Sequence, residues 1–282
     1  MSGEFPRDMN SRGILLFDEI SAADKSLQVA AYQLILDRCL GKLYKLPPGW
    51  LIVAAGNRTE DRAVSTTMSS ALANRFLHFE MHPNRDDWLD WAQLHNIHPA
   101  VQGFIRYKPE YLFTHDHQNL ERGWPSPRSW AKVSKMCHMY NEKKDTLLRK
   151  IVFGLVGNGA GVEFMAFWKL SGKFDDVLDY MLNPSMQIKI PEKNDEKHAL
   201  CAAVSYLLWR GVDEDDEKKR IDGFFRISML LSPDFSTMLM NSALLGKDKK
   251  LSGEYAEKLF NSPMYNDWQE KFGKAFKKRV IL

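Results

Sequence analysis

The most constraining stretch of the 282-residue sequence is a short apolar run, Ile14 to Phe17, that ends in two adjacent carboxylates, Asp18 and Glu19. Four consecutive apolar residues between Gly13 and a charged pair are typical of a strand covered on both faces, as parallel strands between helices are. The carboxyl ends of such strands form the edge where open α/β sheets bind their ligands. Adjacent carboxylates point to opposite faces of a strand, so one can hold a hydrated magnesium ion while the other reaches a water.

Three further polar residues follow predicted elements in a fixed order along the chain. A second apolar run, Trp50 to Ala55, is followed by Asn57. Arg75 closes a helical stretch just before a third short predicted strand, Leu77 to Met81. Arg128 lies in the first turn of a helix that is predicted to begin at a Ser-Pro pair, a typical helix start.

In this order and spacing, the four pieces resemble the Walker B, sensor 1, arginine-finger and sensor 2 elements of AAA+ ATPases, specifically the MoxR-like clade. The motifs cover about the first half of the chain, and the helical remainder resembles the clade more loosely. The resemblance implies that Asp18 is the magnesium-side acid and that Glu19 activates the attacking water. It implies that Asn57 and Arg128 read the γ-phosphate in cis, and that Arg75 does so from a neighbouring protomer.

The same resemblance implies ATP and Mg²⁺ as substrate and cofactor. It also implies a homo-oligomeric ring, expected to be hexameric, that uses ATP hydrolysis to remodel or mature a client protein. A ring follows from the arginine-finger role, because Arg75 would stabilise transition-state charge on a nucleotide held by the next subunit.

Each residue also has a plainer interpretation. An isolated Asp-Glu pair is typical of a solvated turn, and Asn57 of a turn that ends a strand. Arg75 fits an exposed helix end, where the dipole favours a cation. Arg128 is different, because a cation at the positive end of a helix is unfavourable unless an anion neutralises it. That local conflict favours a functional role for Arg128.

A phosphate cradle of the form GxxxxGK[ST] should precede the first carboxylate strand, and the 282 residues contain none. The glycine-rich segment Gly154 to Gly161 lacks the following Lys-Ser or Lys-Thr and is predicted to be a helix-to-helix turn. The chain by itself is therefore expected to have very weak or no ATPase activity. By the resemblance, the missing strand would lie between the sensor 1 strand and Leu77 to Met81. We expect direct pairing of those two strands, a mobile N-terminal half, or completion by another chain.

The predicted fold class is α/β, a partial AAA+ parallel sheet of about three strands, followed by an all-helical lid and a helical C-terminal extension. The expected domains are residues 1–83 for the partial nucleotide-binding core and 84–182 for the lid with sensor 2. Residues 183–282 form the extension, which begins with a proline-containing linker.

Composition fits this class: 44% of the residues are apolar, 27% are charged and the net charge is +3. The three cysteines are far apart, so we interpret them as reduced core thiols of a cytoplasmic protein. We expect no membrane association, because no apolar segment approaches the length of a membrane span.

Two functions from other classes remain open. The first is a non-hydrolysing scaffold or adaptor that retains the AAA+ fold as an interaction module. The second, a minority interpretation, is a nucleic-acid-binding helical protein that uses the basic C-terminal run. In that run an apolar face predicts a docked amphipathic helix, formed by Trp268, Phe272, Ala275, Phe276 and Val280.

Overall fold

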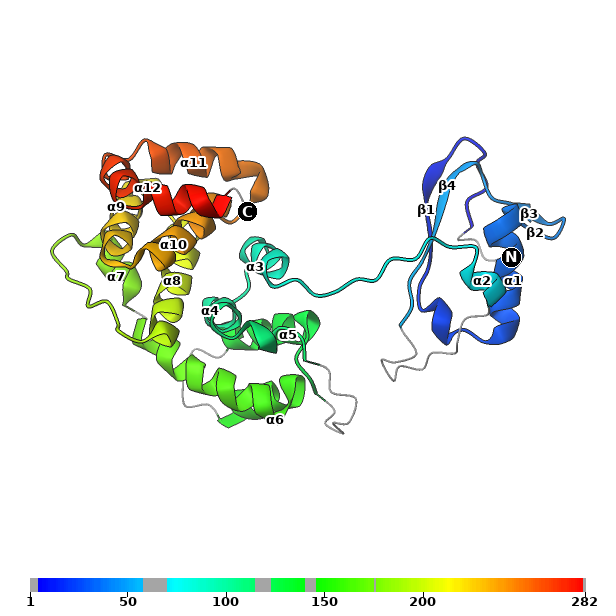
Figure 1. Cartoon of the computed structure of the whole chain (residues 1–282), viewed down its shortest axis with the longest axis horizontal. Helices are drawn as coiled ribbons and strands as arrows, with labels where there is room; N and C mark the ends of the chain where they lie inside the picture. Colours follow the sequence, from blue (N-terminus) through cyan, green and yellow to red (C-terminus); the bar gives the residue numbers. More distant parts are fainter. Residues whose placement is uncertain (1–4, 58–69, 115–122, 140–145, 175, 281–282) are drawn as a thin grey trace. The chain divides into compact units, whose positions relative to one another are not determined.

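The computed structural model describes residues 5–57, 70–114, 123–139, 146–174 and 176–280. The chain divides into two compact units, Met1–Met81 and His82–Leu282, and each is described by itself (Figure 1). The first unit is α/β, and the described part of the second contains helices and no strand, in agreement with the coarse fold expected.

The first unit is built around two parallel strands, β1 (Arg12–Phe17) and β4 (Gly49–Ala54), with Ile14 opposite Leu51 and Leu16 opposite Val53. Helix α1 (Lys25–Asp37) lies in the connection between them, which makes a βαβ unit. A short antiparallel pair, β2 (Cys39–Leu40) and β3 (Tyr44–Lys45), follows α1, and the four-residue helix α2 (Ser70–Ala73) comes later. Figure 1 shows α1 running alongside the two long strands.

The sheet has one covered and one exposed face. On the covered face Leu15, Phe17, Trp50 and Ile52 pack against a small core of Leu34, Tyr44 and Leu46. The opposite face exposes four large apolar side chains, and we call it the open sheet face: Ile14, Leu16, Leu51 and Val53. Parallel sheets normally carry cover on both faces, so the described part of this unit leaves an apolar surface unburied.

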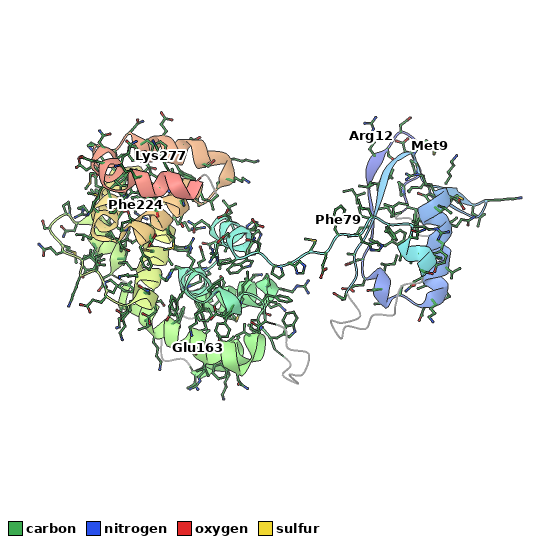
Figure 2. All side chains as sticks on the ribbon, viewed as in Figure 1. Met9, Arg12, Phe79, Glu163, Phe224 and Lys277 are labelled. Atoms are coloured by element: carbon green, nitrogen blue, oxygen red, sulfur yellow. The ribbon has the colours of Figure 1, made fainter. Side chains whose placement is uncertain are left out.

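The prediction of a third strand, Leu77 to Met81, is wrong. Leu77–Met81 has no strand structure, and Leu77, Phe79 and Met81 are exposed to 81%, 81% and 93%. Figure 2 labels Phe79 on this segment. The residues alternate as a strand should, but a strand requires a hydrogen-bonded neighbour, and the described residues provide none here. The parallel sheet therefore has two strands where about three were expected.

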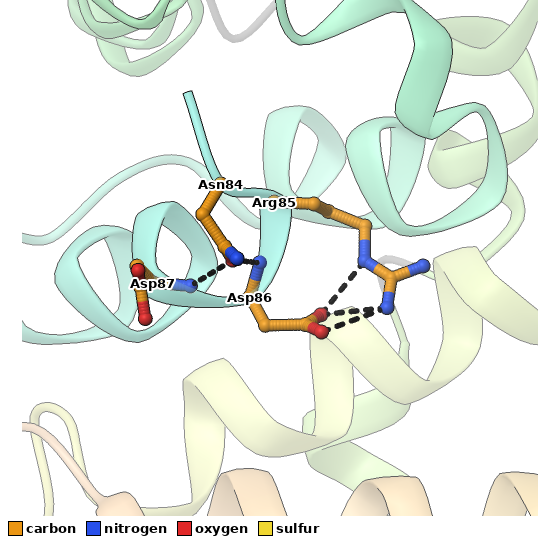
Figure 3. A network of polar contacts seen from close by, with 4 residues as sticks. All are labelled: Asn84, Arg85, Asp86 and Asp87. Atoms are coloured by element: carbon orange, nitrogen blue, oxygen red, sulfur yellow. Dashed lines mark hydrogen bonds and ion pairs between the residues drawn. The ribbon is translucent and has the colours of Figure 1, made fainter. Parts of the chain in front are cut away.

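The second unit begins with a well-capped helix, α3 (Arg85–Leu94). Asn84 Oδ1 accepts hydrogen bonds from the backbone N–H groups of Asp86 at 2.8 Å and Asp87 at 3.0 Å (Figure 3). Arg85 forms a two-pronged contact with the Asp86 carboxylate. Asp86 and Asp87 also lie at the N-terminal, positive end of the helix dipole, where negative charge stabilises the helix.

Nine further α-helices belong to the described part of this unit. They are α4 (Pro99–Tyr107), α5 (Pro127–Met139), α6 (Thr146–Ser171), α7 (Val177–Leu182), α8 (Asn194–Leu208), α9 (Glu214–Leu230), α10 (Pro233–Leu245), α11 (Ser252–Phe260) and α12 (Met264–Val280). The expected boundary between residues 182 and 183 falls inside this unit, because α8 packs on α4 and α6.

Two apolar cores lie within the helical unit. The first spans Trp88 to Ala199 and centres on Phe104, Trp130 and Phe164. The second spans Val177 to Phe272 and includes Phe224, Phe225 and Trp268. Because Trp268 and Phe272 are almost fully buried, α12 is docked on the unit, as the amphipathic pattern predicted. Two of the three free cysteines, Cys137 and Cys201, are also buried, and burial raises the pKa of the Cys201 thiol to about 12.

The glycine-rich segment lies within α6, where Gly157 departs from helical geometry with φ 78° and ψ 172°. It therefore marks a break between two helical halves, close to the predicted turn. By length and composition alone, the run Thr146–Leu182 could cross a membrane, with 44% of its apolar window buried. The expectation that no segment approaches this length is wrong by that criterion. A core helix passes the same test, and Val152, Val156 and Phe164 of this run are buried in the first core.

Candidate functional site at the strand ends

The carboxyl ends of β1 and β4 are held together beyond the last paired strand residues. The backbone N–H of Ala55 donates to the Phe17 carbonyl at 2.9 Å, and the N–H of Ile20 donates to the Ala55 carbonyl at 2.9 Å. These two bonds place the residues that follow each strand at one edge of the sheet. The parallel register thus brings the acidic pair and the amide into one neighbourhood.

The central contact of this site joins Asn57 and Glu19. Asn57 Nδ2 donates a hydrogen bond to Glu19 Oε2 at 2.8 Å, and both residues are exposed. Glu19 has φ 51° and ψ 40°, a left-handed backbone conformation that is uncommon for a residue with a side chain. Such conformations cost about 1–3 kcal/mol and cluster at functional sites.

Asp18 is exposed beside Glu19, and its Oδ1 accepts the Glu19 backbone N–H at 3.1 Å. No group of three or more His, Cys, Asp or Glu residues that could hold a metal ion occurs among the described residues. A single exposed carboxylate still fits Mg²⁺, which usually keeps several waters and binds through one or two carboxylates plus substrate phosphates. Asp18 is therefore chemically suited to a magnesium ion that arrives with a nucleotide.

Arg75 belongs to the same unit, and its side chain contacts Tyr32 and Ala71 of that unit. Its guanidinium lies 5.5 Å from the centre of the Tyr32 ring on α1, and it donates to the carbonyl of Ala71 on α2. Exposed arginines over aromatic rings are weakly stabilised by the cation–π attraction. The side chain is exposed, so the contact does not bury it.

Arg128 belongs to the helical unit, at the second residue of α5. Ser126 Oγ accepts the Ser129 backbone N–H at 3.1 Å, so the predicted cap is present, and Pro127 is the first helical residue. Arg128 is exposed. A T-shaped pair of partly exposed aromatic rings, Phe113 and Trp124, lies in the segments just before this helix.

Sequence reasoning missed the contribution of Ser21. In the structure the Ser21 Oγ accepts the backbone N–H of Asn57 at 3.1 Å. The only available signal was a small hydroxyl residue two positions after Glu19. Nothing in the sequence pattern connects it with Asn57.

No protein-family model matches this chain, and no curated protein or solved structure matches it significantly.

Proposed function

We propose that this chain is the portion of a MoxR-like AAA+ ATPase from Walker B onward, a cytoplasmic ring-forming chaperone that remodels or matures protein partners. The observation that carries the proposal is the hydrogen bond between Asn57 and Glu19 at the carboxyl ends of adjacent parallel strands. An acid that can take a proton from water and an amide that can orient it are the groups that nucleotide hydrolysis requires at this edge.

Each residue has a distinct role in the proposed reaction. Glu19 accepts the proton of the attacking water, and Asn57 orients that water and donates to the γ-phosphate. Asp18 would hold Mg²⁺, which would neutralise phosphate charge. Arg128 contributes positive charge in cis, and Arg75 contributes it to the nucleotide of the next protomer after leaving Tyr32. These roles rest on the resemblance together with the exposure of all five side chains.

The proposal requires a phosphate loop from polypeptide outside these 282 residues, because no GxxxxGK[ST] segment lies within them. That polypeptide is either a preceding segment or a separate chain. The 282-residue chain alone is expected to show very weak or no ATPase activity. A Glu19-dependent ATPase activity of the isolated chain would contradict this expectation.

The test begins with the coding DNA upstream of the Met1 codon, where an in-frame GxxxxGK[ST] segment is expected. The polypeptide extended to include it should hydrolyse ATP, and Glu19→Gln should abolish turnover while retaining the hydrogen bond to Asn57. Asp37→Asn is the matched control, since Asp37 is an exposed acid at the end of α1 in the same unit. ATPase activity that survives Glu19→Gln would refute the assignment.

The open sheet face favours a second candidate, a non-hydrolysing scaffold that uses the α/β unit to bind another protein. Exposed apolar patches commonly mark interaction surfaces. This candidate predicts unrelated DNA upstream of Met1 and protein binding that does not depend on nucleotide. In that case Leu51→Asp, on the open sheet face, should weaken binding, whereas Glu19→Gln should not.

A further inference from the structure

Ser21 is a hydroxyl residue that the structure places between the two strand ends. It lies in a single turn of 3₁₀ helix, Ile20–Ala22, which follows Glu19 directly. Ser21 is only 6% exposed. Its Oγ accepts the backbone N–H of Asn57 at 3.1 Å. A buried side chain from the β1 end therefore holds the backbone that carries the exposed amide of the β4 end.

Gly56 shows how closely this hydroxyl fits the opposite strand end. A Cβ built on Gly56 would lie 2.7 Å from Ser21 Oγ and 3.1 Å from Ser21 Cβ. Real Cβ atoms do not approach other atoms to 2.7 Å, so a side chain at position 56 would displace the hydroxyl. The glycine thus makes room for the contact between Ser21 and Asn57.

The contact between Asn57 and Glu19 needs such support. A hydrogen bond between two exposed side chains contributes little net free energy, because water competes for both groups. Ordering each side chain also costs conformational entropy. Functional groups are held within a fraction of an ångström only when neighbouring contacts fix them, and the backbone of Asn57 is fixed by Ser21.

We propose that Ser21 is a positioning residue, which sets the backbone of Asn57 so that its amide reaches the Glu19 carboxylate. The inference rests on the proposed function only in treating this pair as the hydrolytic site. Ser21 itself does not touch the substrate. Its role is to couple the two strand ends that carry the acid and the amide.

The experiment follows the side-chain amide of Asn57 by NMR in the 282-residue chain, selectively labelled with ¹⁵N-asparagine. In the unaltered chain the shifts of the Asn57 side-chain amide should change on Glu19→Ala, because this substitution removes the acceptor of its hydrogen bond. In Ser21→Ala this change should fall about twofold or more, because the amide is no longer held against the carboxylate. Ser21→Thr retains the hydroxyl and should restore the coupling.

Gly56→Ala provides a second route to the same result. It leaves the Ser21 hydroxyl in the chain but pushes it from the Asn57 N–H, so it should reduce the coupling as Ser21→Ala does. Ser26→Ala is the matched control, because Ser26 is an exposed serine on α1 and should have no effect. Thermal unfolding separates lost positioning from lost structure. If Ser21→Ala does not fold, Gly56→Ala and Ser21→Thr decide the question.

Two results would overturn the inference. One is full coupling between Asn57 and Glu19 in a folded Ser21→Ala chain, or in a folded Gly56→Ala chain when Ser21→Ala does not fold. The other is an unaltered chain in which the Asn57 amide does not respond to Glu19 at all. Neither result involves ATP, so they are distinct from a failure of the proposed function, which is decided by Glu19→Gln in the extended polypeptide.

Discussion

Asn57 donates to Glu19 across 38 positions of sequence, from Nδ2 to Oε2 at 2.8 Å. The contact exists because β1 and β4 are parallel neighbours, so that the residues that follow both strands emerge at one edge. Glu19 has a left-handed backbone conformation at that edge. The contact between Asn57 and Glu19 therefore follows from the parallel topology, and it joins the two groups of the candidate site.

Asn57→Ala is predicted to separate stability from catalysis. The lost hydrogen bond is exposed, so the free energy of unfolding should fall by about 1 kcal/mol or less. If the proposed function holds, kcat for ATP hydrolysis by the extended polypeptide should fall about a hundredfold, because the proposed donor to the developing charge is gone. Steady-state ATPase assays and denaturant unfolding of the same samples provide both numbers.

The control for this change is Asn10→Ala. Asn10 is an exposed amide of the same unit whose hydrogen bond to Asp8 uses the backbone N–H, so the substitution should leave kcat and stability unchanged. A kcat for Asn57→Ala within about twofold of the unaltered protein would remove Asn57 from the site, since even one donor is worth far more than this factor.

The sequence predicted the strands and the helix start that are determined by residues close together in the chain. The apolar runs at β1 and β4 are strands. The Ser-Pro start predicted α5 to the residue, because a cap and a proline act within one turn. The expectation that Glu19 and Asn57 share one site came from the family resemblance and not from these local patterns.

Elements that depend on distant partners were missed. Leu77–Met81 has a strand pattern but no neighbour to pair with in the described residues. The two-residue strands β2 and β3 are too short to have a period. Arg38 donates to the carbonyls of Pro47 at 2.9 Å and Trp50 at 2.6 Å, and Ser21 accepts from Asn57. Side-chain bonds to remote backbone have no sequence signature.

Gly223→Ala is predicted to force α7 and α9 apart. A Cβ on Gly223 would lie 2.4 Å from the Cα and carbonyl oxygen of Met181, and backbone atoms cannot move aside as a flexible side chain can. The unfolding free energy should fall by about 1–3 kcal/mol or more, as in overpacked cores. Denaturant unfolding followed by tryptophan fluorescence measures the loss.

The matched control is Gly253→Ala on α11, where no atom lies within 4 Å of the new Cβ. There the substitution should be neutral or stabilise by a few tenths of a kcal/mol, roughly what helix propensity provides near a helix end. Equal effects at the two glycines would show that α7 and α9 do not approach each other so closely.

Trp268 is predicted to anchor the C-terminal helix. Its buried Nε1 donates to Ser228 Oγ at 2.9 Å and Ser236 Oγ at 2.8 Å. Trp268→Phe should cost about 1–2 kcal/mol, because it removes the donor but retains most of the volume, and Trp268→Ala about 3–5 kcal/mol. Unfolding free energies and protease cleavage of α12 check the order. Lys277→Ala, at an exposed site of the same helix (Figure 2), should change neither.

His98 is predicted to make the helical unit sensitive to acid. Burial, and then the charge of nearby His138, lower the pKa of His98 to about 3, and its Nδ1 accepts the Ala100 N–H at 3.1 Å to cap α4. Since the folded pKa lies below the unfolded value of about 6.5, the unfolded chain takes up the proton first. The contribution of His98 to stability is therefore full above pH 6.5 and falls toward pH 3, by at most about 1.4 kcal/mol per pH unit.

His98→Asn retains a capping acceptor and does not titrate, so it should flatten the stability profile between pH 6.5 and 4. Part of the slope should remain, because burial also lowers the pKa of His198, to about 4. Denaturant unfolding at stepped pH measures both profiles, and identical slopes would mean that His98 is protonated equally in the folded and unfolded chain.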